Sequence, residues 1–189
     1  MPRILNVLGI DPSLRNWGLA FGTLQLEPLD LNIYRLEVIN PVIPSGKQVR
    51  QNSKDLESAF QLAAASQQAS QGQHAIFVEV PVGSQSARAM ASYGICVGVL
   101  GALRATGIPF FEVTPTEVKL ALTRDKNATK DQMISKAMEL HPKAPWPLYK
   151  TKGSEAVSSA KAEHMADAVG AIYAGINTNA FSQLRAMLN

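Results

Sequence analysis

Two short apolar runs in this chain each end in a carboxylate. Ala75–Val78 is followed by Glu79, and Val7–Ile10 is followed by Asp11. A continuous apolar run of this length is typical of a strand that is covered on both faces. An unpaired ionised carboxylate at the end of such a strand would be costly to bury. If the two strands are parallel neighbours, both carboxylates emerge at the same edge of the sheet, where ligand sites in open α/β sheets gather.

Three further strands are predicted around these two. Trp17–Leu24 and Leu31–Ile39 form an antiparallel opening with the first strand, and Ile108–Val113 is the fifth. The late strands are connected through helices. This order implies an α/β fold with a mixed sheet that is partly parallel and flanked by helices. A length of 189 residues suits about one domain, so we expect a single domain over residues 1–189, too short for a two-lobed enzyme.

Two helices are expected to flank the fourth strand. The first ends at Gly72, and the apolar residues that recur in it at helical spacing are Val49, Leu56, Phe60 and Ala63. The second covers about Ser86–Thr106 and contains Gly94, Gly98 and Gly101. Because glycine lowers helix propensity, these three positions indicate the close approach of another backbone.

Capping patterns predict the helices that follow. Thr114-Pro115-Thr116-Glu117 combines a capping residue, proline at the first helical position and glutamate at the third. Thr129 with Gln132 repeats the capping box. The segment His141–Ser159 contains three prolines, and a final helical stretch begins near Lys161.

The composition is that of an ordinary soluble globule. Apolar residues make up 46% and charged residues 17%, which excludes an intrinsically disordered chain. The longest nearly apolar run, Tyr93–Leu103, is shorter than the roughly 20 residues of a membrane span. The single cysteine, Cys96, excludes an intrachain disulfide and favours a reducing compartment. The net charge of +3 is compatible with a polyanionic partner.

The start of the final helix carries further groups that can bind a metal. Glu163 and His164 each lie one helical turn from Asp167, so either pair could present two ligands together. The same stripe continues with small residues, namely Ala168, Ala171 and Gly175. They would let the helix lie close on the sheet and bring Asp167 toward Asp11 and Glu79. The alternatives are a solvated first turn favoured by the helix dipole, or carboxylates that cap helices or pair with nearby basic residues.

Basic and aromatic residues suggest contacts with nucleic acid. A basic cluster lies around the break between the two capped helices and consists of Lys119, Arg124, Lys126 and Lys130. Basic side chains and free backbone N–H groups both suit phosphate, although a loop of this kind is usually just solvated. Farther along, Trp146 and Tyr149 lie among lysines and could stack an unpaired base. The prolines around them could equally make a stiff packing loop.

Four short sequence blocks follow one another along almost the whole chain in an order that can be compared with known protein families. They are Leu8-Gly9-Ile10-Asp11-Pro12-Ser13 with Gly18, then Val78-Glu79, then Val118-Lys119 with Lys130-Asp131-Gln132, and finally His164-Met165-Ala166-Asp167-Ala168. Together they resemble the RuvC-type Holliday junction resolvases of the ribonuclease H-like superfamily. The resemblance implies a ribonuclease H-like fold, with a five-stranded mixed sheet flanked by helices on both faces. It also implies an acidic cluster that binds two divalent ions, Mg²⁺ or Mn²⁺.

The resemblance implies a catalytic and metal-binding role for four residues. Asp11 would bridge the two ions, Glu79 would hold one of them, and Asp167 with His164 would complete the site. Glu163 is the rival ligand if the alignment is off by one residue. Two such ions can activate a water and stabilise the leaving oxygen of a phosphodiester. Because imidazole favours Mn²⁺ and must be neutral to bind it, we expect better activity with Mn²⁺ and a steep loss below pH about 6.5.

The resemblance also bears on how DNA is bound. Lys119 and Lys130 match family lysines that contact DNA phosphates. The loop Pro81–Ser86, with Gln85 and the nearby Arg88, falls where the family meets the junction centre with an apolar or aromatic wedge. This loop has no aromatic residue, and its Val82 is a poor substitute. The possible replacements are Trp146 and Tyr149.

Family members act as two-fold dimers, so the resemblance implies a homodimer. The helix expected over Ser86–Thr106 matches their interface helix, and Gly94-x-x-x-Gly98 would let two copies approach closely. Packing on the protein's own sheet explains these glycines as well. A two-fold enzyme suits a four-way junction, because symmetric nicks need two equivalent sites.

The leading hypothesis is a metal-dependent, structure-selective endodeoxyribonuclease that resolves Holliday junctions or other branched DNA. The compact size and altered wedge fit a phage-borne member, acting in the cytoplasm of a bacterium or of a phage-infected host cell. One alternative is a ribonuclease H-like nuclease that acts on RNA. Another is a noncatalytic junction-binding module in which His164 marks a lost ligand.

Overall fold

The core of the protein is a mixed sheet of five strands. The computed structural model describes residues 4–44, 46, 50–151 and 154–188. The strands are β1 (Ile4–Asp11), β2 (Trp17–Gln25), β3 (Asp30–Ile39), β4 (Ala75–Glu79) and β5 (Phe111–Val113), in the order β3-β2-β1-β4-β5. The first three strands pair antiparallel, whereas β1, β4 and β5 run parallel. The predicted antiparallel opening and parallel portion are therefore confirmed. The fifth strand is shorter than predicted, since only its last three residues pair.

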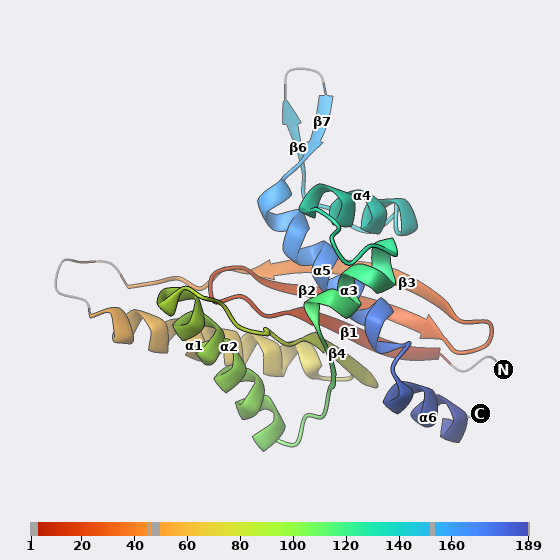
Figure 1. Ribbon diagram of the computed structural model, residues 1–189, viewed down its shortest axis with the longest axis horizontal. Coiled ribbons are helices and arrows are strands. Elements are labelled where there is room, and N and C mark those ends of the chain that lie inside the picture. Colours follow the sequence, from red (N-terminus) through yellow and green to blue (C-terminus); the bar gives the residue numbers. More distant parts are fainter. Residues whose placement is uncertain (1–3, 45, 47–49, 152–153, 189) are drawn as a thin grey trace.

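Helices cover both faces of this sheet, as predicted (Figure 1). One face packs on α1 (Gln51–Ser70) and α2 (Ala87–Ala105) through a cluster that includes Leu8, Trp17 and Leu62. The other face packs on α5 (Ser159–Gly175), which α3 (Pro115–Thr123) and α4 (Lys130–Leu140) cover from outside, with α6 (Asn179–Leu188) at the carboxyl end. Both predicted capping boxes are present, at the starts of α3 and α4.

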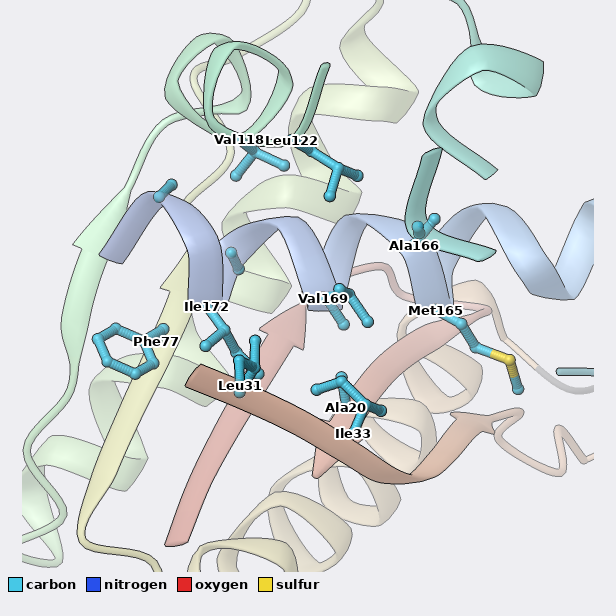
Figure 2. Close-up of a cluster of buried hydrophobic side chains, with 14 of the residues drawn as sticks. Ala20, Leu31, Ile33, Phe77, Val118, Leu122, Met165, Ala166, Val169 and Ile172 are labelled. Carbon is cyan, nitrogen blue, oxygen red and sulfur yellow. The ribbon is translucent and has the colours of Figure 1, made fainter. Parts of the chain in front are cut away.

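The contact between α5 and the sheet is unusually close. Figure 2 shows α5 with Val169 and Ile172 on the side of the sheet and with Val118 of α3 beyond it. A Cβ atom added to Gly9 of β1 would collide with the backbone oxygen of Ala168, and one added to Gly18 of β2 would collide with that of His164. A Cβ atom added to Gly175 of α5 would likewise collide with the ring of Phe77 on β4, so this small residue of the stripe does allow the helix to lie close on the strands, as the sequence predicts.

The predicted packing face of α1 is confirmed at Ala63, which is partly buried against the sheet, but it is wrong at Leu56 and Phe60. Leu56 and Phe60 are 72% and 64% exposed, whereas the buried residues of the helix are Ser58, Leu62, Ser66 and Ser70. Ser58 and Ser70 donate their hydroxyl hydrogens to backbone carbonyls one turn earlier, so these hydroxyls are buried with a partner. Helical spacing identified the helix but did not identify the side that faces the sheet. Val49, the first residue of the predicted stripe, lies outside the described residues.

Within the part of the chain that the structure describes, the glycines of α2 do not meet another backbone. Gly94, Gly98 and Gly101 are exposed, and a Cβ atom added to any of them would have nothing within 4 Å. The expectation that they permit close packing on the protein's own sheet is therefore wrong. The face of α2 that contacts the core is formed by other residues, namely Cys96, Val99, Leu100 and Leu103.

The segment between α4 and α5 contains a hairpin that the sequence did not predict. Strands β6 (Leu148–Thr151) and β7 (Ser154–Val157) pair with each other and form a sheet of their own. The hairpin protrudes from the body of the molecule (Figure 1). At its base, Trp146 is 7% exposed and its Nε1 donates to the backbone oxygen of His141 at 3.0 Å. Trp146 is a core residue in this arrangement, so the expectation that it stacks an unpaired base is wrong.

No helix in the described part of the chain is long and apolar enough to cross a membrane.

Candidate active site

The parallel pairing of β1 and β4 brings two carboxylates together. Ile10 is aligned with Val78, so Asp11 and Glu79 follow at neighbouring strand ends. The close packing of α5 then adds Glu163, His164 and Asp167 from the opposite side. All five side chains line one cavity of about 230 Å³. The structure thus places every predicted metal-binding residue, and the rival Glu163, around a single space.

His164 and Asp11 are in direct contact. Nδ1 of His164 lies 2.6 Å from Oδ2 of Asp11, and the two side chains are 18% and 12% exposed. Burial raises the pKa of Asp11, and His164 opposes this only in part. Burial lowers the pKa of His164, but the hydrogen bond to Asp11 and the nearby negative charges outweigh it, so the net shift is upward. The pair therefore retains a proton more readily than either group would in water.

The pKa values of Glu79 and Asp167 are also shifted, so that both carboxyl groups favour their protonated forms. Burial, followed by repulsion from Asp11 and Asp167, raises the pKa of Glu79 to about 9. Burial and repulsion from Asp11 and Glu163 raise the pKa of Asp167 to about 7. The positive charge of Lys119 on α3 opposes both shifts. Such mutual repulsion is the electrostatic condition that a bound cation relieves.

The chemistry of these groups fits a divalent cation, but their side chains are not arranged to coordinate one ion together. Carboxylate oxygens suit Mg²⁺ and Mn²⁺, and an added imidazole favours Mn²⁺. Among the residues that the structure describes, no three His, Cys, Asp or Glu side chains are grouped to hold one ion. The 2.6 Å contact between Nδ1 of His164 and Oδ2 of Asp11 occupies two atoms that could otherwise hold an ion.

Glu163 has a different partner from the other acidic residues. Its Oε1 lies 2.6 Å from Nζ of Lys130, the first residue of α4. The sequence had suggested Lys130 for phosphate and Glu163 as a rival metal ligand, and it gave no sign that the two would pair. Residues so far apart along the chain carry no shared local pattern, and only the packing of α4 on α5 joins them.

The cavity is also lined by two polar residues that the sequence analysis did not assign to the site. Ser13 follows the β1 strand end, and Tyr93 comes from α2. Ser13 is the last residue of the first sequence block, Leu8–Ser13, but no function was predicted for it. Tyr93 was counted only as part of an apolar run, and no spacing links it to the acidic residues.

The predicted DNA-contacting residues have different surroundings. Arg124 and Lys126 are exposed in the loop that leaves α3, and Gln85 is exposed before α2. Arg88 lies on the surface but binds Asp55 of α1, with two nitrogen–oxygen distances of 3.1 Å. Tyr149 on the protruding hairpin is 50% exposed. The structure therefore leaves these side chains accessible, except that Arg88 already has an acidic partner.

The fold and the acidic cavity together define a class of protein. A five-stranded mixed sheet in the order β3-β2-β1-β4-β5 with helices on both faces is a ribonuclease H-like fold, and in this chain carboxylates stand at the ends of β1 and β4. The fold is shared with solved structures of low sequence identity. Thermus thermophilus RuvC in complex with a Holliday junction substrate matches with a TM-score of 0.62 and 20% identity, over 90% of this chain and 92% of that one. The yeast mitochondrial Holliday junction resolvase Ydc2 matches with a TM-score of 0.57 and 16% identity, over 97% and 86%.

Sequence comparison identifies the family. No protein-family profile matches the chain. The crossover junction endodeoxyribonuclease RuvC of Anaeromyxobacter dehalogenans (strain 2CP-C) is 33% identical over 141 residues, which cover 74% of this chain and 71% of that protein. RuvC of Anaeromyxobacter sp. (strain Fw109-5) is 34% identical over 133 residues, or 69% and 60% of the two chains. This chain belongs to the RuvC family of crossover junction endodeoxyribonucleases.

Proposed function

We propose that this protein is a structure-selective endonuclease that resolves Holliday junctions by hydrolysing a phosphodiester in each of two strands. The observation that carries the proposal is the convergence of Asp11, Glu79, His164 and Asp167 on one cavity in a chain of the RuvC family. RuvC-type nucleases depend on divalent metal ions. Here we assign two ions per site, Mg²⁺ or Mn²⁺, to these four side chains. The whole chain acts as a single nuclease domain in the cytoplasm.

Each side chain has a distinct task in this mechanism. Asp11, central in the sheet, would contribute to holding both ions, Glu79 would hold one of them, and His164 and Asp167 would complete the site from α5. When bound, two divalent ions supply an activated water and stabilise the leaving 3′ oxygen of an in-line attack. Burial, followed by repulsion from neighbouring carboxylates, raises the pKa values of Glu79 and Asp167, so both side chains would have to lose their protons to hold a cation.

The DNA backbone lies across the face formed by α3, α4 and their connecting loop. Lys119 and Lys130 contact phosphates near the cavity, and Arg124 and Lys126 contact phosphates farther out. Gln85 contacts DNA from the loop before α2 and Arg88 contacts it from the first turn of α2, where Arg88 must leave Asp55 to do so. The exposed ring of Tyr149 stacks on an unpaired base and takes the place of the missing wedge residue.

The active form is a homodimer through α2. The three exposed glycines share the helix with Met90 and Val97, each 46% exposed. Because packing on the protein's own sheet no longer explains these glycines, a second copy of the same helix does. Two active sites related by a two-fold axis match the symmetry of a four-way junction.

A panel of synthetic substrates tests the proposal. Four-way junctions, flaps, linear duplexes and RNA–DNA hybrids are incubated with Mg²⁺ or Mn²⁺, for the wild type and for Asp11→Asn. We expect the wild type to cut junctions in preference to the other substrates, and Asp11→Asn to bind junctions without cutting them. Preferential cleavage of RNA hybrids, or junction binding without cleavage by both proteins, would overturn the proposal.

A further inference from the structure

The ion pair between Lys130 and Glu163 stands at the rim of the acidic cavity. Lys130 is 74% exposed, whereas Glu163 is 22% exposed and lines the cavity itself. Lys130 is held at the start of α4 by the capping box of Thr129, and Glu163 belongs to the same helix as His164 and Asp167. The pair therefore joins a surface cation, accessible to DNA, to a carboxylate that faces the proposed metal site.

Lys130 cannot fully serve two anions at once. Because the Lys130 end of the pair is 74% exposed to water, its ammonium is held only weakly, so a DNA phosphate that approaches the rim can take it from Glu163. The carboxylate of Glu163 is then left without its counterion next to the other acidic groups. Its charge already acts on Asp11 and Asp167 across the cavity. Losing Lys130 makes the cavity more negative and thus more attractive to a divalent cation.

We propose that the Lys130–Glu163 pair is an exchangeable contact through which junction binding strengthens cation binding at the active site. In the free protein Lys130 neutralises Glu163, and on the junction Lys130 binds phosphate while Glu163 adds its charge to the site. Glu163 is therefore a positioning residue and not one of the four metal ligands. By linkage, the cation strengthens junction binding by the same factor. The inference rests on the proposed function, because it takes branched DNA and a divalent cation as the two ligands.

The test measures this coupling factor without relying on cleavage. Junction affinity is measured by fluorescence anisotropy in EDTA and in saturating Ca²⁺, with a denaturing gel to verify that the DNA stays intact. The ratio of the two affinities is the coupling factor. Titration of the free protein with Mn²⁺, followed by electron paramagnetic resonance, gives its cation affinity separately.

Both single variants are expected to lower the coupling factor. Lys130→Gln does so by raising the cation affinity of the free protein, and Glu163→Gln does so by raising the junction affinity in the absence of the cation. Lys130→Gln leaves Glu163 unneutralised, so the free protein binds Mn²⁺ at least threefold more tightly and gains less from the junction. Glu163→Gln frees Lys130, so the junction binds more tightly in EDTA, yet the cation strengthens binding at least threefold less than in the wild type. Coupling factors are usually about 5- to 150-fold, so a threefold change in the factor can be resolved.

Lys136→Gln is the matched control. Lys136 also lies on α4 and forms a 2.6 Å pair, with Glu139, away from the cavity. This variant removes the same charge from the same helix and should keep the wild-type coupling factor. An unchanged coupling factor in both Lys130→Gln and Glu163→Gln, with cation-strengthened binding in the wild type, would overturn this inference alone. A wild type that binds no junction would instead overturn the proposed function.

Discussion

His164 differs from the three carboxylates of the site in both its chemistry and its partner. It is a neutral ligand type among acidic ones, and its Nδ1 lies 2.6 Å from Asp11 Oδ2. A protonated imidazole cannot bind a metal, so in the proposed metal site a proton held by this pair would compete directly with the cation. The upward shift of the His164 pKa makes the competition extend above the ordinary histidine range.

The first prediction concerns the choice of metal and its dependence on pH. We expect junction cleavage to be faster with Mn²⁺ than with Mg²⁺, and to fall as the pH drops, beginning above about 6.5 because the His164 pKa is raised. Initial rates across pH 5.5–9 with each metal measure both effects. His164→Asp should reduce the preference for Mn²⁺. Equal rates with the two metals, unchanged in His164→Asp, would contradict the assignment of His164 as a ligand.

The second prediction concerns the stability of the metal-free protein. The pKa of Glu79 is about 9 in the fold and near 4.5 in an unfolded chain, so its stabilising contribution is present below pH 4.5 and is lost as the pH rises toward 9. In EDTA at pH 9, Glu79→Gln should therefore melt several degrees above the wild type. Mn²⁺ should raise the Tm of the wild type at this pH and raise that of Glu79→Gln less. A Tm of the wild type in EDTA that does not change between pH 6 and 9 would argue against the burial of this charge.

At the scale of secondary-structure elements, the site depends on how closely α5 lies on β1 and β2. Gly9 and Gly18 leave room for the backbone of α5 at Ala168 and His164. Because His164 and Asp167 lie on this same stretch of helix, the strand glycines control how near these side chains come to Asp11 and Glu79.

The third prediction tests this contact with two glycines in different settings. Gly9→Ala places a methyl group against Ala168 and Ile172, which should destabilise the protein by about 1–3 kcal/mol and weaken Mn²⁺ binding as α5 is displaced. Gly94→Ala adds the same methyl group on the open face of α2 and should stabilise the monomer by about 0.5–1 kcal/mol. Urea unfolding and Mn²⁺ titration measure the two effects. Similar stability changes in both variants would contradict the close approach of α5.

The fourth prediction concerns the protruding hairpin. Tyr149→Ala should leave the Tm nearly unchanged, because the side chain is half exposed, but weaken junction binding by roughly fivefold or more through the loss of base stacking. Trp146→Ala is the contrasting variant, since it removes a buried ring and should lower the Tm by several degrees. Anisotropy titration and thermal melting separate the two. Unchanged junction binding in Tyr149→Ala would exclude this ring as a stacking contact.

At the scale of the whole molecule, one face of α2 is exposed to solvent and packs on no other described part of the chain. It combines exposed small residues with Met90 and Val97, whereas the active-site cavity receives Tyr93 from the same helix. A dimer built on this face would link the positions of two active sites through one pair of helices.

The fifth prediction addresses that dimer. Gly98→Lys introduces a long charged side chain where the wild type has open space, so the monomer should remain folded while the dimer dissociates. Analytical ultracentrifugation measures the change of mass. On a four-way junction, the two strands should then be nicked independently and no longer in a paired manner. A dimer as stable as that of the wild type would place the interface elsewhere.

Much of the site could be predicted because it follows local patterns. Asp11 and Glu79 terminate apolar strands, and the small stripe after Asp167 marks the side of α5 that meets the sheet. Other features depend on contacts between distant segments. The pairing of Glu163 with Lys130 is one example, and the exposure of Phe60 on α1 is another. Local patterns placed these residues on helices correctly. They did not show which side of each helix faces another segment of the chain.

The amino-acid sequence alone determined the order of the five sheet strands and of the helices that connect them, the positions of the acidic residues at strand ends and the resemblance to a nuclease family. These properties depend on neighbouring residues, whose periodicity and capping act over a few positions. The tertiary structure alone decided which faces are buried, that Trp146 belongs to the core, and that His164 contacts Asp11. Burial, pairing and the resulting pKa shifts depend on atoms from distant segments meeting in space, and no local pattern specifies that meeting.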